Sequence, residues 1–357
     1  MSLDVSSREF GRLPDGMVAE LFSIRNNRRT EVNLTNWGGI ITSVRTVDRD
    51  GTLGEITLAR DTLREYLEGH PYYGALVGRV ANRISRGGFT LDGTRYPLPS
   101  NLGDLHLHGG VRGFDKQIYH AEVIREDRRA GVTLSRTSPA GEEGYPGELL
   151  ARCTVTLSDD DVLRFTFDAE TDHATVVNLT NHCYWNLSGE ATILDHELYL
   201  AADGVAETDR QAVPTGRLLP VAEGPFDFSA WKPIRPGFEE LQRVGVNGFD
   251  HSLAIAGWSE NAAAELRETA AVRSVRSGRM MTVSTTYPAV HFYSGNNLAG
   301  ETGRHSGKLR GQEALCLECQ YFPDAPNRPE FPSIVLRPGE RYHHVTEHRF
   351  TTFSLPR

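Results

Sequence analysis

Short stretches in which apolar and polar residues alternate recur along most of the chain. Each stretch is rich in β-branched or aromatic residues and is bounded by turn residues, a pattern that predicts β-strands. Because successive side chains of a strand point to opposite faces, the alternation also predicts one buried and one polar face. The clearest segments are 131–135, 152–157, 162–168, 175–180, 281–287, 289–294 and 314–322.

Helical periodicity is scarce by comparison. It is confined to residues 61–68, for which Asp61 is the expected N-cap, and to the short segment 238–243. No glycine-rich turn leads from a strand into a long helix, so a dinucleotide-binding or P-loop fold is not expected. Neither a linker nor an internal repeat divides the chain. The pattern therefore predicts one mostly antiparallel β-sandwich domain, residues 1–357, with few short helices.

Composition narrows the class of protein further. The 357 residues include 38 Lys+Arg and 47 Asp+Glu, a net charge of −9, so nucleic acid is not an expected partner. Without an apolar run of roughly 18 residues or a secretory leader, we expect neither a membrane partner nor export. The four cysteines are too few for a disulfide scaffold. A cytoplasmic location is the resulting expectation.

Two residues are the main candidates for acid–base chemistry. Glu318 lies in the apolar segment 314–322, where burial would raise the pKa of its carboxyl towards the range of a general base. His182 lies in 178–187, NLTNHCYWNL, at the polar end of a predicted strand, and imidazole transfers protons near neutral pH. A solvent-facing or ion-paired glutamate and a structural histidine are the simpler alternatives for each residue taken alone.

Metal binding is not expected at the remaining chemical motifs. His106 and His108 in HLHGG would share a strand face, but the glycines and Arg112 that follow supply no third ligand. Cys316 and Cys319 would point to opposite faces of a strand and lack a second cysteine pair for zinc. The cysteines are better explained by packing.

Planar polar groups and aromatic rings together have the chemistry of a sugar site. Asn, Asp and Arg side chains pair with hydroxyls, and aromatic rings cover the apolar face of a pyranose. The candidates for such a pocket are Asn82, Arg83, His108, His182, Tyr184, Asp250 and Glu318.

An ordered series of motifs resembles the aldose 1-epimerase (galactose mutarotase) family from about residue 32 to 350. The motifs include GRVANRIS (78–85), LHGGVRGFDK (107–116), NLTNHCYWNL (178–187), GFDHSL (248–253), TTYPAVHFYSGNNL (285–298) and LECQYFPDAPNRPEFPSIVLRPGERY (317–342). The resemblance implies a β-supersandwich of two broad antiparallel sheets. It also implies that the protein interconverts the α and β anomers of free aldoses of the glucose or galactose type.

The resemblance further implies a role for each matched residue. Glu318 corresponds to the catalytic base and His182 to the catalytic acid. The matched sugar-binding positions are Asn82, Arg83, His108, Tyr184 and Asp250, whereas His106 is a support or surface residue. Where the family often has a sugar-contacting Gln or Glu, this chain has Tyr287, whose phenol could hydrogen-bond to the substrate. Proton transfer between these groups needs no cofactor.

Three other functions remain open at this stage. A glycoside hydrolase could use Asp250 and Glu318 as its paired carboxylates. A non-catalytic carbohydrate-binding protein would keep the aromatic rings without needing His182 and Glu318 together. A hexose-6-phosphate epimerase would surround the phosphate with additional Arg or Lys. The expected partner is in each case a small-molecule sugar, bound by a monomer or weak homodimer.

Overall fold

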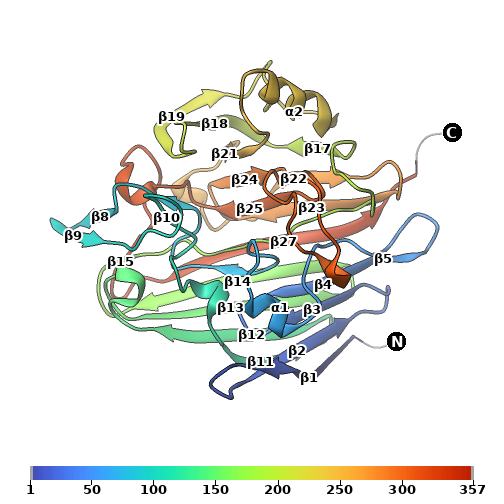
Figure 1. Ribbon diagram of the computed structural model, residues 1–357, viewed down its shortest axis with the longest axis horizontal. Coiled ribbons are helices and arrows are strands. Elements are labelled where there is room, and N and C mark those ends of the chain that lie inside the picture. The colour runs from blue at the N-terminus through green and yellow to red at the C-terminus, as the bar shows by residue number, and fades with distance from the viewer. Residues whose placement is uncertain (1–2, 355–357) are drawn as a thin grey trace.

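The computed structural model describes residues 3–354, so the two ends of the predicted domain 1–357 lie outside the described part. A nine-stranded sheet crosses the centre of the molecule (Figure 1). Its neighbouring strands are all antiparallel. In spatial order they are β11 (His120–Glu126), β12 (Arg129–Ser138), β13 (Leu149–Ser158), β14 (Val162–Thr171), β27 (Tyr342–Thr352), β23 (Arg279–Thr285), β22 (Arg267–Arg273), β17 (Glu197–Leu200) and β20 (Lys232–Pro233).

Two five-stranded sheets complete the sandwich. The first runs β1 (Asp4–Arg12), β2 (Val18–Arg25), β3 (Glu31–Thr35), β4 (Ile41–Val47) and β5 (Leu53–Glu55). The second runs β19 (Pro214–Pro220), β18 (Ala202–Thr208), β21 (Asp250–Ile255), β24 (Ala289–Tyr293) and β25 (Cys316–Gln320). One apolar core draws buried side chains from all three sheets, among them Val32, Phe165 and Val290. The prediction of a mostly antiparallel β-sandwich is confirmed.

Four two-stranded pairs lie outside the large sheets. They are β7 (Arg83–Ile84) with β10 (His106–Leu107), β6 (Leu76–Val77) with β16 (Thr180–Asn181), β15 (Thr175–Val176) with β26 (Val335–Leu336), and β8 (Gly88–Leu91) with β9 (Thr94–Pro97). The predicted strand 175–180 is thus broken in the middle, because Val177 and Asn178 donate their backbone N–H groups to Ile334 and Arg79 instead. Single 3₁₀ turns occur at Phe114–Lys116, Glu142–Gly144, Glu260–Ala262, Arg304–Ser306 and Ala325–Asn327.

The two α-helices, α1 (Leu63–Leu67) and α2 (Ile234–Arg243), fall where helical periodicity was found. The expected cap of α1 was wrong by one residue. Thr62, not Asp61, is the N-cap: its hydroxyl accepts from the Glu65 N–H, and the Glu65 carboxylate accepts from the Thr62 N–H. This reciprocal capping box satisfies two backbone donors that Asp61 alone would leave open. Neither helix, within residues 3–354, is long and apolar enough to cross a membrane.

Candidate active site

A pocket of about 170 Å³ opens beside the second five-stranded sheet. Its walls come from segments that are far apart in sequence but joined by short strand pairs: β7 with β10, β6 with β16, and β21 with β24 and β25. Nearly all of the residues predicted from the sequence line it together. The lining comprises Pro71, Tyr72, Asn82, Arg83, Leu102, Leu107, His108, His182, Tyr184, Asp250, His291, Tyr293, Asn297 and Glu318.

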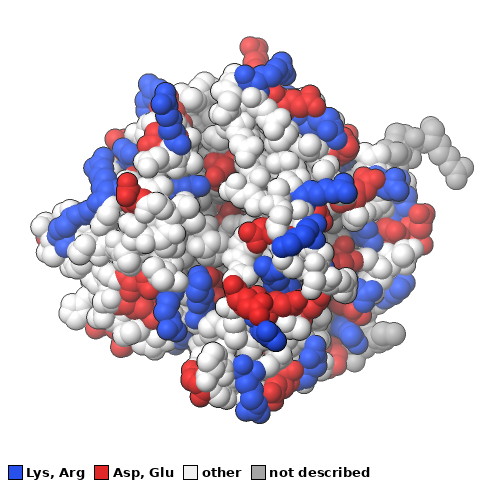
Figure 2. Space-filling view, in the orientation of Figure 1, with Lys and Arg blue, Asp and Glu red and all other residues white. Residues whose placement is uncertain are grey.

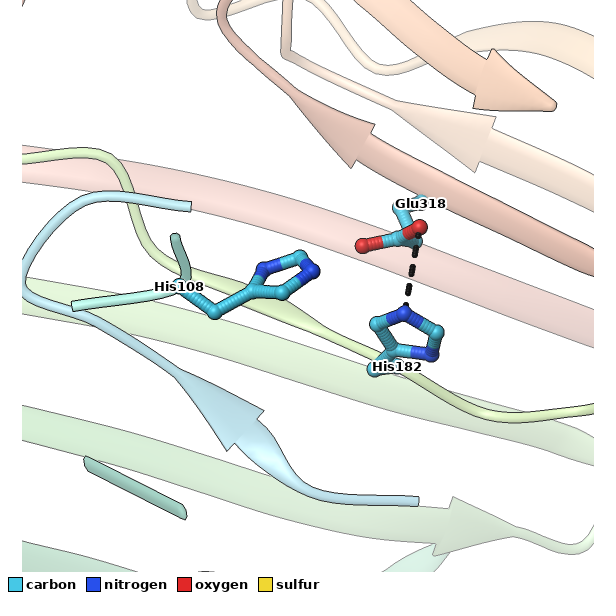
Figure 3. Close-up of side chains that lie close together, drawn as sticks. All are labelled: His108, His182 and Glu318. Carbon is cyan, nitrogen blue, oxygen red and sulfur yellow. Dashed lines mark ion pairs between the residues drawn. The ribbon is translucent and has the colours of Figure 1, made fainter. Parts of the chain in front are cut away.

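Glu318 and His182 face each other at the floor of this pocket (Figure 3). Glu318 stands on β25, and His182 follows β16, whose Thr180 hydroxyl donates to the Cys319 carbonyl and so fixes the two segments. The His182 Nε2 lies 3.6 Å from the Glu318 Oε1. Both side chains are almost entirely buried. The other carboxylate oxygen, Oε2, is buried without a hydrogen-bond partner among the described residues, so it remains available to a ligand.

Burial moves the pKa values of this pair in opposite directions. Loss of hydration lowers the pKa of His182 to about 4. The same loss of hydration, with the negative charge of Asp250 nearby, raises the pKa of Glu318 well above its ordinary value, although Arg83 opposes this. Burial therefore favours the neutral form of each of the two groups.

Aromatic rings and a thiol surround His182. The rings of Tyr72 and Tyr184 both stack on the imidazole, at centroid distances of 5.9 and 4.9 Å. On its far side, the Nδ1 lies 3.5 Å from the Cys316 Sγ. Burial raises the pKa of Cys316, so the thiol stays protonated and is able to donate to Nδ1. The Nε2 of His182 is thereby directed to the pocket.

His108 is fixed by an exchange of hydrogen bonds with Asn82. The His108 N–H donates to the Asn82 carbonyl, and the Asn82 N–H donates to the His108 Nδ1 at 3.2 Å. Both residues have positive φ angles, 50° and 64°, which side chains other than glycine rarely adopt. Because Nδ1 accepts, the neutral ring carries its proton on Nε2 and donates into the pocket. Burial and nearby positive groups lower the pKa of His108 and keep it neutral.

Asp250 and Arg83 form an ion pair at the side of the pocket. The Arg83 Nη2 lies 2.9 Å from the Asp250 Oδ2, and the Arg83 Nη1 also donates to the Asn82 side-chain oxygen. Burial alone would raise the pKa of Asp250, but the hydrogen bond from His291 and the charge of Arg83 lower it far more. Asp250 is therefore a carboxylate and an acceptor for hydroxyl groups.

A metal ion fits this cluster poorly. His108, His182 and Glu318, which the sequence placed in one pocket, present ligand atoms within 4.8 Å of one another. Two imidazoles and a carboxylate are a ligand set that zinc accepts. However, the Asn82 N–H occupies the His108 Nδ1, so the Nε2 that faces the cluster carries a proton instead of a free lone pair.

Tyr287 is the one predicted sugar contact that lies elsewhere. It is fully buried in the main core, where its hydroxyl donates to the Leu179 carbonyl and pairs with the Tyr342 hydroxyl at 2.7 Å. The pocket lining does not include it. The expectation that its phenol reaches the substrate is therefore corrected. His106 has the support role expected: its Nε2 lies 2.7 Å from the Tyr145 hydroxyl.

Four polar or aromatic pocket residues were not predicted from the sequence: Tyr72, His291, Tyr293 and Asn297. His291 carried a usable signal, because it interrupts an apolar strand two residues from Tyr293 and so shares its face. Tyr72 carried none. Its φ of 61° turns the chain in a way that no local motif indicates.

Comparison with known proteins agrees with this geometry. The sequence profile of the family described as aldose 1-epimerase matches residues 20–349. The galactose mutarotase of Rattus norvegicus is 42% identical over 353 residues, with 98% of this chain and 99% of the relative covered. The aldose 1-epimerase of Escherichia coli K12 is 36% identical, with 94% and 96% covered.

The chain belongs to the aldose 1-epimerase family.

Solved structures in the same group have the same fold. An aldose epimerase homologue from Caenorhabditis elegans superposes with a TM-score of 0.84 at 28% identity, covering 93% of this chain and 98% of that one. The galactose 1-epimerase of Lactobacillus acidophilus gives 0.85 at 24% identity, covering 99% and 100%. The strand arrangement of this aldose 1-epimerase family member is therefore the family's own. Its pocket unites a buried carboxyl–imidazole pair, a neutral donor and a fixed carboxylate.

Proposed function

We propose that the protein is an aldose 1-epimerase that interconverts the α and β anomers of free aldoses, with Glu318 as base and His182 as acid. The observation that carries the proposal is the buried pair at 3.6 Å on the floor of a pocket lined by hydroxyl-binding groups. Family membership supports the reaction class. The two residue roles are our own assignment.

The reaction moves two protons and breaks one bond. Glu318 accepts the proton of the anomeric hydroxyl while His182 donates a proton to the ring oxygen, and the bond between C1 and the ring oxygen breaks. The aldehyde rotates about C1–C2, and the reverse transfers close the ring on its other face. Each positioned group contributes roughly 10²–10⁴-fold.

The shifted pKa values of Glu318 and His182 favour ring opening. Before opening, the pair is a carboxylate and an imidazolium; afterwards it is a neutral acid and a neutral imidazole. Burial lowers the pKa of His182 and raises that of Glu318, so the dry site favours the neutral pair that accompanies the open sugar. The Nε2–H of His108 and the Arg83 guanidinium are placed to stabilise charge on the sugar oxygens.

Substrates with a phosphate suit this pocket less well. Among the residues that line it, Arg83 is the only Lys or Arg, and Asp250 already neutralises it at 2.9 Å. Figure 2 shows basic and acidic side chains interspersed over one face of the molecule. We therefore favour a free aldose of the glucose or galactose type. A glycoside hydrolase would use Glu318 as the acid and the ionised Asp250 as the nucleophile or base, so an aryl glycoside assay is needed to distinguish it from an epimerase.

Polarimetry of freshly dissolved α-glucose and α-galactose tests the proposal. Glu318→Gln should lower kcat by about 10²–10⁴-fold while binding of a methyl galactoside, which cannot open, stays within a few-fold. Glu313→Gln, five residues before Glu318 and not among the residues that line the pocket, is the control. A Glu318→Gln enzyme within about threefold of the parent would contradict the base assignment. Release of nitrophenol from an aryl glycoside would indicate a hydrolase instead.

The domain organisation, the oligomeric state and the cellular compartment are also proposals. We propose that the chain works as one domain, as a monomer or weak homodimer, because the main apolar core draws buried side chains from all three large sheets. The four cysteines are free and buried, which supports a reducing compartment such as the cytoplasm.

A further inference from the structure

We propose that His291 is a positioning residue that fixes Asp250 for sugar binding, and that Ser252 in turn fixes the imidazole of His291. This inference rests on the proposed function, since it concerns how the same pocket holds its substrate. Neither residue was expected to have a role from the sequence.

The three side chains form one continuous hydrogen-bonded row across two neighbouring strands. The Ser252 Oγ lies 2.9 Å from the His291 Nδ1, and the His291 Nε2 lies 2.8 Å from the Asp250 Oδ1. Strand register holds the row together: Ser252 on β21 is directly opposite His291 on β24. On its other side, His291 is directly opposite Glu318 on β25. The row is therefore built into the sheet that carries the proposed base.

The direction of the hydrogen bonds follows from Asp250. The ionised carboxylate can only accept, so the His291 Nε2 must carry a proton. When the ring is neutral, its Nδ1 is then an acceptor, and the Ser252 hydroxyl, which is able to donate, completes the row. A rotated or differently protonated ring would turn a lone pair towards the carboxylate. Asp250 thus sets the tautomer, and Ser252 holds the ring at the nitrogen that this tautomer leaves as an acceptor.

With His291 on one oxygen and Arg83 on the other, the plane of the Asp250 carboxylate is fixed. The Arg83 Nη2 donates to Oδ2 at 2.9 Å while His291 donates to Oδ1. The Asp250 side chain is still 26% exposed, whereas that of His291 is only 3% exposed. The carboxylate therefore keeps free lone pairs for sugar hydroxyls, and the imidazole acts from behind it.

The same three residue types form the Ser–His–Asp triad of hydrolases, but here the row is reversed. In a hydrolase the serine oxygen faces the substrate and the aspartate is buried behind the histidine. In this protein Ser252 is 2% exposed and is not among the pocket-lining residues, whereas Asp250 is. The row therefore orients an acceptor and does not activate a nucleophile.

The test compares three variants by polarimetry at several sugar concentrations. In His291→Leu, Asp250 loses one charge-assisted hydrogen bond, so we expect KM to rise about 10- to 100-fold with kcat within about threefold. His291→Gln retains an N–H donor and should bring KM back to within about fivefold of the parent. Ser252→Ala should raise KM by about two- to fivefold, because the ring keeps its hydrogen bond to Asp250 but loses the one that holds its Nδ1.

Thermal unfolding of each variant separates positioning from stability. If His291→Leu leaves KM unchanged in an active enzyme, or if His291→Gln raises KM as much as leucine does, the inference is overturned. Should His291→Leu not fold, Ser252→Ala decides: a KM equal to the parent's in that variant would also overturn the inference. A parent without any mutarotase activity would instead overturn the proposed function, so the two failures are distinct.

Discussion

Replacing His348 with leucine should make the protein less sensitive to acid. His348 lies on β27 and is 4% exposed, with its ring against Phe165 and Trp185 at centroid distances of 5.7 and 5.1 Å. Its Nδ1 is buried without a hydrogen-bond partner among the described residues. Burial lowers the pKa of His348 to about 3, so the ring stays neutral in the folded protein.

The sign of the pH dependence of stability follows from proton binding. An unfolded histidine has a pKa of about 6.5, so below that pH His348 binds a proton in the unfolded chain but not in the folded protein. Stability is therefore fully present above about pH 6.5 and falls as the pH drops towards the folded value of about 3. Between pH 7 and pH 5 the loss due to His348 is about 2 kcal/mol. The leucine variant lacks this loss.

Other buried histidines act in the same direction. Among them are His182 and His196, whose pKa burial lowers to about 4, and His344, whose pKa it lowers to about 3. We expect the parent protein to lose stability in mild acid, and the variant to lose less.

Urea unfolding at pH 7 and pH 5, followed by tryptophan fluorescence, measures this difference. The fall in unfolding free energy between the two pH values should be about 2 kcal/mol smaller in His348→Leu than in the parent. His120→Leu is the control, because the His120 side chain is 70% exposed and already in contact with water. An equal fall in His348→Leu and the parent would refute the reasoning.

Three further outcomes are expected. His182→Asn should lower kcat by about 10²–10⁴-fold. Its residual rate should no longer decline at alkaline pH, because the imidazole that loses its proton there in the parent is absent. A persisting alkaline decline in kcat/KM would pass the acid role to His108. Treatment with EDTA and desalting should leave the rate unchanged, since His108 presents a protonated Nε2 to the other two groups; activity that returns only on adding a divalent ion would be the opposite result. Arg79→Met should destabilise the fold by at least about 3 kcal/mol in urea unfolding, because the buried guanidinium donates to the carbonyls of Ser138, Pro139 and Pro146, and a loss under about 1 kcal/mol would contradict this.

The sequence predicted the strands better than their ends or their contacts. Segments such as 152–157 and 162–168 alternate because one face meets the core, and they became β13 and β14. The cap of α1 was missed because Asp61 and Thr62 are both good caps, and only the position of Glu65 decides between them. Tyr287 was misplaced because a motif fixes a position in the chain, not the side of the sheet on which its side chain points.

The proton state of the site depends on packing that no single segment contains. Glu318 was recognised as a carboxylate in an apolar strand, yet its elevated pKa depends on the burial created by distant segments. The His108 tautomer likewise depends on one backbone N–H, that of Asn82, 26 residues away. Side-chain identity in the sequence was enough to predict which groups meet in the pocket. The direction of the hydrogen bonds between them could be determined only from the folded structure.

The segments that form the pocket span residues 71–318, and no stretch of consecutive residues contains a usable part of it. A sugar that needs all of them is a ligand of the folded state alone. At a concentration of 100 times its Kd, such a sugar adds about 2.7 kcal/mol to the unfolding free energy. The upward shift in melting temperature with each candidate aldose would therefore rank substrates by affinity without any turnover. A fragment that ends before Glu318 would gain nothing from any of them.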